Sequence, residues 1–310
     1  MIRLLKGLAI VALALAVAVF AFAEVREYTD RDNTMPVITA DSDTIDVPCD
    51  YTQEQLLAGV TACDDKDGDL TSLVLVGSCT RFIDPGVCDL SYVVFDSSEH
   101  MATLTRRVHF TGYHSPQFAL RQPLVFAEGT TTNTDVRGMF TANDVLDGDL
   151  TDWITYVETD AAYDNPGDYT ITMEVSNSFG DTVRYAFPIH IYERNTQNLT
   201  IDLTEPLVYV DQGSSFDPLA YVGSIHDYAE EEYDRSLLQV NSTVDTATPG
   251  IYEVHYEIGT RPGLEATETE PTEENVDTDA ETAEGEPDVS LSAGQYGQTW
   301  LTVIVQEVAA

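Results

Sequence analysis

The sequence contains few basic residues for its length. Its 310 residues hold 14 Lys and Arg against 54 Asp and Glu, which gives a formal net charge of −40 at pH 7. A chain of this charge repels phosphate backbones and anionic lipid, so nucleic acid is excluded as a partner. General disorder is not the cause of the acidity, because 43% of the residues are hydrophobic and can form a core.

Beyond its N-terminus the chain lacks a long apolar run. Residues 7–23 are almost continuously apolar, follow a short basic region and close with Ala21-Phe22-Ala23. This small-x-small ending predicts that segment 1–23 is a cleaved signal peptide. The alternative is a retained membrane anchor, because about 17 apolar residues is near the lower limit for crossing a bilayer. In both cases we expect the rest of the chain, beginning with a linker at 24–35, to lie outside the cytoplasm.

Signatures of catalysis are also missing. The sequence has no Gly-x-Ser-x-Gly, no phosphate-binding loop, no His-Glu-x-x-His and no dinucleotide-binding glycine motif. Its six histidines are scattered, and no two of them are spaced four residues apart. We therefore assign no catalytic residue and expect a protein that is not an enzyme.

Cysteine is scarce and confined to one stretch, where the four are Cys49, Cys63, Cys79 and Cys88. An even, clustered set in an exported chain predicts two disulfides. Three pairings are possible. We favour Cys49–Cys63 with Cys79–Cys88, because the second pair flanks a turn at Pro85-Gly86. Zinc is disfavoured, since there is no Cys-x-x-Cys pair and no histidine at ligand spacing.

An internal repeat organises the chain. Residues 64–71, Asp-Asp-Lys-Asp-Gly-Asp-Leu-Thr, recur at 144–151 as Asp-Val-Leu-Asp-Gly-Asp-Leu-Thr. Pro-Gly pairs at 85–86, 166–167 and 249–250 keep nearly the same offset. A fixed period of this kind is typical of tandem copies of one structural unit.

Each Pro-Gly pair precedes an alternation of apolar and mostly polar residues. The apolar positions are Cys88, Leu90, Tyr92 and Val94, then Tyr169, Ile171, Met173 and Val175, then Tyr252, Val254, Tyr256 and Ile258. Such alternation predicts a strand with one buried face. Many short strands separated by turns predict an all-β protein of three tandem two-sheet sandwiches, at 36–112, 115–193 and 197–306.

The third copy departs from the other two. Residues 224–232 stand where the Asp motif is expected, and the motif there has decayed. An acidic tract at 261–290 has few large apolar residues, which predicts a disordered insertion. The chain then returns at 298–305 with the residues of a last strand.

The combined pattern resembles the bacterial immunoglobulin-like (Ig-like) domain family. The second copy carries the resemblance best, through Asp147-Gly148-Asp149-Leu150-Thr151, Pro166-Gly167-Asp168-Tyr169 and Asn177-Ser178-Phe179-Gly180. Such repeats occur in surface proteins of Gram-positive bacteria and in a pesticidal crystal protein. The resemblance implies three Ig-like Greek-key sandwiches in an extracellular setting, where these domains often serve as spacers or adhesive modules.

The aspartates of the repeat are the candidate ligand site. They are Asp64, Asp65, Asp67 and Asp69 in the first copy and Asp144, Asp147 and Asp149 in the second. Carboxylates at alternate positions can converge on calcium, the one cofactor that the sequence suggests. The alternative, which we favour, is a turn in which Asp side chains accept backbone N–H groups and Gly adopts a positive φ.

Two tyrosines recur at one position of the repeat. Tyr169 and Tyr252 each stand two residues after the Gly of a Pro-Gly pair, where the first copy has Cys88. They could stack on a ligand. We favour inward packing with the hydroxyl on a backbone group, as tyrosines do in Ig-type corners.

The function expected from the sequence is that of a non-catalytic extracellular module, secreted or on the cell surface, with an adhesive or spacer role. The alternative is a carbohydrate-binding or accessory module of a secreted enzyme system, which a strip of exposed aromatic residues would support. A hydrolase with an unrecognised site is a third possibility. The expected partner is an extracellular protein or a glycan, and a membrane is contacted only through 1–23 if that segment is retained.

Overall fold

The computed structural model describes residues 2–30, 33–262, 291–292 and 294–307. Its contacts divide the chain into two compact units, residues 1–111 and 112–310. Most of the acidic tract for which we predicted disorder, 261–290, lies outside the described residues.

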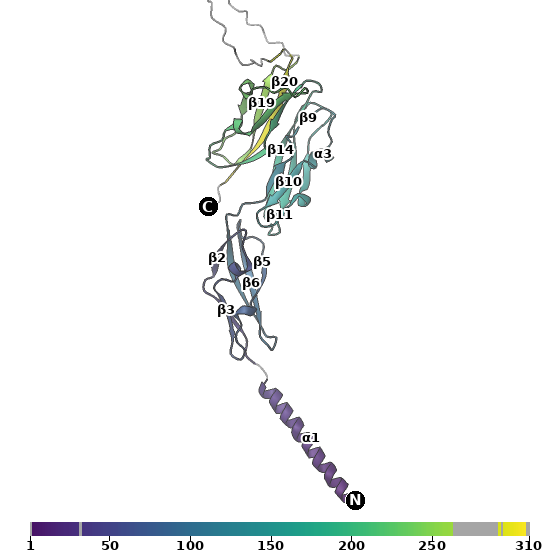
Figure 1. The fold of residues 1–310 in the computed structure, drawn as a ribbon, viewed down its shortest axis with the longest axis vertical. Helices are drawn as coiled ribbons and strands as arrows, with labels where there is room; N and C mark the ends of the chain where they lie inside the picture. The colour runs from purple at the N-terminus through teal and green to yellow at the C-terminus, as the bar shows by residue number, and fades with distance from the viewer. Residues whose placement is uncertain (1, 31–32, 263–290, 293, 308–310) are drawn as a thin grey trace, which may run out of the picture. The chain divides into compact units, whose positions relative to one another are not determined.

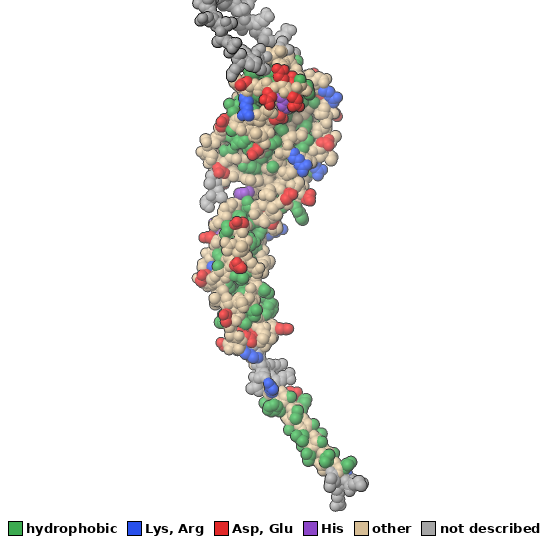
Figure 2. All heavy atoms as spheres, viewed as in Figure 1, with side chains coloured by type: hydrophobic (Ala, Val, Ile, Leu, Met, Phe, Trp, Pro, Cys, Tyr) green, Lys and Arg blue, Asp and Glu red, His purple; other side chains and the backbone are tan. Residues whose placement is uncertain are grey.

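The N-terminal segment forms one helix, α1 (Ile2–Asp30) (Figure 1). The helix continues past the predicted cleavage point into the predicted linker. Its stretch from Leu5 to Arg26 is long and apolar enough to cross a membrane, and none of it is buried. Figure 2 shows these apolar side chains along the helix. A signal sequence has the same properties, so both alternatives for this segment stand.

The rest of the first unit is a two-sheet sandwich. One sheet has the strand order β1-β3-β4, and the other has the order β2-β7-β6-β5. The strands are β1 (Val37–Ala40), β2 (Thr44–Pro48), β3 (Val60–Asp64), β4 (Gly68–Asp69), β5 (Leu75–Cys79), β6 (Val87–Phe95) and β7 (Met101–Thr111). The short helices are α2 (Gln53–Leu56) and the 3-10 helix η1 (Thr71–Leu73).

The second unit contains two further sandwiches. The first of them pairs a β11-β10-β8 sheet with a β12-β13-β14-β9 sheet. Its elements are β8 (Gln117–Leu120), β9 (Val125–Ala127), α3 (Asn133–Arg137), β10 (Phe140–Asp144), β11 (Gly148–Asp149), η2 (Thr151–Trp153), β12 (Thr155–Thr159), β13 (Gly167–Ser176) and β14 (Thr182–Tyr192).

The last sandwich pairs a β15-β17 sheet with a β16-β20-β19-β18 sheet. Its elements are β15 (Leu199–Leu203), β16 (Leu207–Asp211), η3 (Pro218–Tyr221), β17 (Val222–Asp227), η4 (Arg235–Leu237), β18 (Gln239–Ser242), β19 (Gly250–Gly259) and β20 (Tyr296–Gln306). We call the three sandwiches copies 1, 2 and 3.

All three copies share one topology. The opening segment of each is split between the two sheets, and its second half pairs in parallel with the last strand: β2 with β7, β9 with β14, and β16 with β20. All other strand pairs are antiparallel. The predicted alternation also holds, since Cys88, Leu90, Tyr92 and Val94 of β6 are all buried. The predicted class, all-β with three tandem Ig-like sandwiches, is confirmed.

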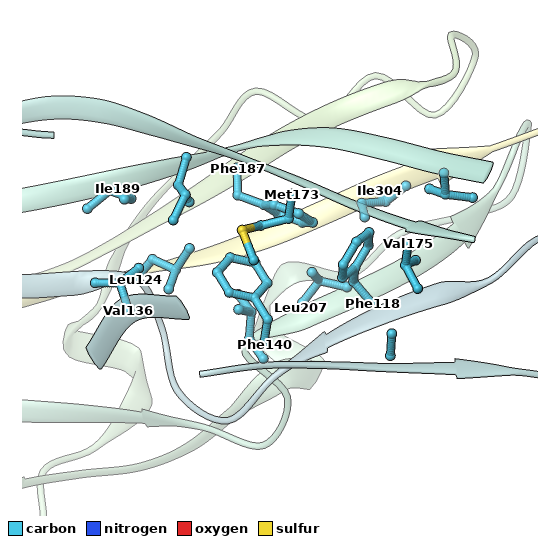
Figure 3. Packing of buried hydrophobic residues seen from close by; sticks show 14 of the residues in the cluster. Phe118, Leu124, Val136, Phe140, Met173, Val175, Phe187, Ile189, Leu207 and Ile304 are labelled. Atoms are coloured by element: carbon cyan, nitrogen blue, oxygen red, sulfur yellow. The ribbon is translucent and has the colours of Figure 1, made fainter. Parts of the chain in front are cut away.

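Copies 2 and 3 share a hydrophobic core. Leu207 of β16 and Ile304 of β20 belong to copy 3, yet they lie in one buried cluster with Phe118, Phe140 and Phe187 of copy 2 (Figure 3). Residues on both faces of β20 are therefore buried, one face in copy 3 and the other against copy 2. The two buried faces explain why neighbouring positions of this strand are both apolar, as at 303–305.

Candidate functional site

The Asp motif of copy 1 is a hydrogen-bonded turn. Oδ1 of Asp64 accepts the backbone N–H groups of Lys66 at 2.8 Å and Asp67 at 3.0 Å. Asp67 in turn accepts the backbone N–H of Ser97 at 2.6 Å and its hydroxyl at 2.8 Å. Gly68 has a φ of 78°, as predicted for the glycine of this turn. The motif thus fixes the β3–β4 turn to the β6–β7 hairpin.

Copy 2 repeats the same turn. Oδ1 of Asp144 accepts the N–H groups of Leu146 at 2.9 Å and Asp147 at 3.0 Å. Asp147 accepts the backbone N–H of Ser178 at 2.6 Å and its hydroxyl at 2.9 Å. Gly148 has a φ of 74°. The sequence repeat is therefore a repeat of hydrogen bonds.

The last aspartate of each motif accepts the backbone N–H of the first residue of a 3-10 helix. Oδ1 of Asp69 accepts the N–H of Thr71 at 2.9 Å, and Oδ1 of Asp149 accepts that of Thr151 at 2.9 Å. Hydrogen bonds from the threonine side chain and then its backbone lower the pKa of each carboxyl. Both carboxylates therefore accept hydrogen bonds from residues of their own turn.

These bonds support the turn interpretation of the seven candidate aspartates. Six of them accept groups of the turns, and Asp65 is exposed. Within the described ranges, no three His, Cys, Asp or Glu side chains are grouped as a metal ion would require. Calcium binding stays a prediction.

The sequence suggests that copy 3 has lost the Asp motif, but the structure shows that its first aspartate is retained. Oδ1 of Asp227 accepts the N–H groups of Ala229 at 2.8 Å and Glu231 at 3.0 Å. The N–H of Tyr233 then bonds to the carbonyl of Ile225 at 2.8 Å, as Leu70 and Leu150 do in the other copies. Residues 227–233 therefore correspond to 64–70 and 144–150. Our interpretation missed this because only the first aspartate of the motif remains.

The Cys79–Cys88 part of the predicted disulfide framework fits the fold. Both residues are thiols in the structure. They lie on the adjacent strands β5 and β6, within hydrogen-bonding reach of each other. The hydrogen bond lowers the pKa of Cys79 and raises that of Cys88, which is also raised by burial. A bond between them remains a prediction.

The Cys49–Cys63 pairing disagrees with the strand register. Sγ of Cys49 lies 3.7 Å from the carbonyl of Thr111, at the end of β7. Cys63 lies on β3 close to the turn that bonds to Ser97, beside the start of β7. An 11-residue strand separates these two points, and its ten steps span about 34 Å at 3.4 Å per residue. A disulfide needs Cα atoms within about 7 Å, so this pairing is not supported.

The recurring tyrosines pack as predicted. The hydroxyl of Tyr169 donates to the carbonyl of Asn165 at 3.2 Å, and that of Tyr252 donates to the carbonyl of Thr248 at 2.9 Å. Both rings are partly buried against the cores of their own copies. Each hydroxyl therefore fixes the loop that carries the Pro-Gly pair.

A stack of three rings joins copies 2 and 3. Trp300 lies between His190 and His255, with centroid separations of 4.0 and 4.2 Å and interplanar angles of 10° and 16°. Nδ1 of His190 lies 2.8 Å from Oδ1 of Asp168, and its Nε2 lies 2.6 Å from Oε1 of Glu253. Burial lowers the pKa of His190, but the hydrogen bonds and charges of Glu253 and Asp168 outweigh this, so the pKa is raised.

Sequence reasoning missed this cluster. His190 and Glu253 are 63 residues apart and come from different copies. No local spacing could have paired them. The sequence signal nearest to the cluster is the pair of adjacent apolar residues Trp300 and Leu301, followed by three more at 303–305, which indicates a strand that needs a partner on both faces.

Two grooves run between copies 2 and 3. The first, of about 470 Å³, is bordered by β8, β10 and β16 and has Asp149 in its wall. The second, of about 370 Å³, lies between the β8–β9 loop, the end of β14, β15 and the loop after β17. We call the second the Tyr228 groove. Six of its lining residues are used below: Arg121, Gln122, Tyr192, Gln197, Asp202 and Tyr228.

Comparison with known proteins finds one distant curated relative. No family model matches the chain. The chain is 28% identical over 247 residues to the pesticidal crystal protein Cry22Aa of Bacillus thuringiensis, a match that covers 75% of this chain. It spans 32% of the length of that relative. The match is consistent with the Ig-like resemblance of the repeats.

Solved structures give weaker likenesses. The CBM51-2 and INT domains of Clostridium perfringens ZmpB, solved in complex with GlcNAc, are 13% identical, with a TM-score of 0.20. That match covers 53% of this chain and 30% of the other. The protocadherin GammaB4 extracellular domain is 11% identical, with a TM-score of 0.20, covering 89% of this chain and 52% of that one. Scores this low support no inference about this protein.

Proposed function

We propose that the protein is a non-catalytic extracellular module, exported through α1, whose Ig-like sandwiches serve as a stiff spacer or adhesive unit. The observation that carries the proposal is the core that copies 2 and 3 share through Leu207 and Ile304. Tandem domains move relative to one another unless their interface is large and hydrophobic. A shared buried core opposes such motion and favours one fixed arrangement of the two copies.

The residues that the sequence marks as candidate ligand groups, namely the motif aspartates and the recurring tyrosines, also support a spacer or adhesive role. The aspartates of both intact motifs accept hydrogen bonds of turns, and the recurring tyrosines hold loops. These residues are engaged in building rigid sandwiches. A rigid exported unit is suited to presenting a surface at a distance from the membrane or to contacting another extracellular molecule.

The proposal is tested by location. Intact cells expressing the full chain are treated with an external protease, and the N-terminus of the exported protein is sequenced. We expect the sandwiches to be accessible from outside, and a new N-terminus at Glu24 would identify cleavage after Ala23. Full protection in intact cells, with digestion only after lysis, would contradict an extracellular role.

Carbohydrate binding is a second candidate function. The observation that favours it is Tyr228, whose side chain is 87% exposed and lines a groove with several polar groups. The support expected for a carbohydrate-binding module was a strip of exposed aromatic residues on a sheet face. Tyr228 is instead a single exposed aromatic ring at a groove.

A further inference from the structure

We propose that the Tyr228 groove binds a neutral oligosaccharide, with the ring of Tyr228 as the platform for one sugar. The inference rests on the extracellular role proposed above and specifies the ligand and its site. The site is built from both copies of the second unit: Arg121, Gln122 and Tyr192 come from copy 2, and Asp202 and Tyr228 come from copy 3.

Tyr228 is an aromatic residue in the turn of copy 3, at a position where the other two copies have no aromatic residue. It follows Asp227, the counterpart of Asp64 and Asp144, so copies 1 and 2 have Asp65 and Val145 in its place. The Asp227 side chain closes the loop through the N–H groups two and four residues later. Asp227 therefore fixes the loop without help from Tyr228. The Tyr228 ring is 87% exposed, so it does not stabilise the loop by burial. Large exposed aromatic rings on fixed loops are typical of recognition surfaces.

A second tyrosine faces the same groove. Tyr192, at the end of β14, is partly buried and lines the groove with Tyr228. Burial raises the pKa of Tyr192, and the nearby Tyr228 hydroxyl raises it further. Both tyrosines line the same groove, one from each copy. Together they offer ring faces and hydroxyls to one ligand.

Gln197 supplies a donor that the protein leaves unused. Its Oε1 accepts the backbone N–H of Gln298 at 3.3 Å, which fixes the orientation of the amide. Its Nε2 is buried and has no hydrogen-bond partner among the described residues. Buried donors are nearly always satisfied, so this unpaired amide is an exception in the wall of the groove. A rotation of the Gln197 side chain toward the groove, which it lines, would bring Nε2 to a hydroxyl oxygen of a ligand.

Arg121 is a second unused donor group. In the second unit, Arg137 stacks on Tyr156, Arg194 bonds to the Glu128 carbonyl and Arg235 bonds to a backbone carbonyl. The Arg121 guanidinium has no such contact within the described ranges, although the chain carries a net charge of −40. Its planar set of N–H donors is available to ligand oxygens in the groove.

The charge of the molecule selects a neutral ligand. A protein with a net charge of −40 repels acidic glycans at a distance. Among the lining residues Arg121 is the one cation and Asp202 the one carboxylate. Oδ2 of Asp202 accepts from Ser224 at 2.9 Å and lies 3.0 Å from Nε2 of His226. The wall is rich in amides and hydroxyls, so a purely apolar ligand would leave many polar groups unpaired. Hydroxyl groups on a ring with an apolar face match this lining.

The test uses the exported chain, residues 24–310, on a panel of neutral oligosaccharides built from hexoses and N-acetylhexosamines. Sialylated and uronic-acid oligosaccharides form the acidic arm. Binding is then measured by calorimetry for the neutral compound that is captured best. We expect capture in the neutral arm, and at least a tenfold loss of affinity in Tyr228→Ala with most of it kept in Tyr228→Phe.

The matched control is Trp153→Ala, since Trp153 is an aromatic residue of copy 2 that is 71% exposed and does not line the groove. It should leave affinity unchanged, and Gln197→Leu should lower it. Three results would overturn the proposal. They are capture of acidic compounds only, a loss of affinity in Trp153→Ala equal to that in Tyr228→Ala, and binding only of extended peptides along β15. External location is measured separately, so an accessible chain that binds no neutral glycan refutes this inference and leaves the extracellular role standing.

Discussion

Asp144 is the residue on which the turn interpretation can be tested most directly. It is 1% exposed, its Oδ1 accepts two backbone N–H groups, and its Oδ2 accepts the Asn177 amide at 3.2 Å. Asp144→Ala leaves these buried donors unpaired, so we expect the free energy of unfolding to fall by about 3 kcal/mol. Chemical denaturation of residues 24–310 measures this loss. Asp65→Ala, at an exposed position of the same motif, is the control and should change little.

Thermal unfolding with and without calcium separates the turn from a calcium site. If the carboxylates only hold turns, the melting temperature of the unaltered chain should not change when Ca²⁺ is added. A rise that disappears in the double variant Asp67→Ala, Asp147→Ala would establish calcium binding instead.

His190 should make stability depend on pH. Its pKa in the folded protein is raised above the ordinary histidine value of about 6.5, so the folded state binds the proton more tightly than the unfolded state. The resulting stabilisation is fully present below about pH 6.5 and is lost as the pH rises through the folded-state pKa. We expect the melting temperature to fall over this range, and the fall to be smaller in His190→Gln.

The control for this prediction is His226→Gln. The pKa of His226 is also raised, first by a hydrogen bond to the Asp227 backbone, but its side chain is 28% exposed against 10% for His190, so its interactions are screened more strongly. It should contribute less to the pH dependence than His190. An unchanged pH profile in His190→Gln would show that Glu253 and Asp168 do not hold a proton on this ring.

Among the structural elements, the β5–β6 hairpin makes the most definite prediction. Oxidation of the exported chain should link Cys79 to Cys88, because their thiols lie within hydrogen-bonding reach on adjacent strands. A bond closing so short a loop stabilises a domain by about 2–3 kcal/mol. Non-reducing peptide mapping should find this link, and Cys79→Ser should lose its stabilisation. Cys63→Ser, at an exposed site, is the control; a Cys49–Cys63 link would contradict the strand register.

Local patterns were sufficient to predict most elements. The alternation after each Pro-Gly pair marked β6, β13 and β19, because a strand with one buried face alternates by physical necessity. The Asp motif marked its turn, since the acceptor and the glycine stand within a few residues of each other. Pairings between distant residues could not be read in this way. The Cys49–Cys63 pairing was chosen on nearness in sequence, and it disagrees with the strand register because nearness in sequence is not nearness in space.

At the scale of the whole molecule, the relation between copies 2 and 3 was beyond the sequence. The repeat indicates three similar domains in a row, and nothing in its period says that two of them bury a common core. Leu207 and Ile304 look like ordinary strand residues. Their role depends on which face each strand turns to its neighbour, and that is decided by the register of β16 on β20.

Adjacent residues of β20 allow this shared core to be tested. Ile304 packs in the cluster of copy 2 and Val303 packs in that of copy 3, and both are at most 1% exposed. Ile304→Ala should cost about 2–5 kcal/mol, the usual range for a buried isoleucine, and Val303→Ala should also destabilise the unit. Hydrogen exchange separates them: Ile304→Ala should increase exchange in β8 and β10 of copy 2, whereas Val303→Ala should increase it mainly in β15 and β17. If Ile304→Ala leaves copy 2 unaffected, the two copies do not share a core, and the argument for a stiff spacer fails with it.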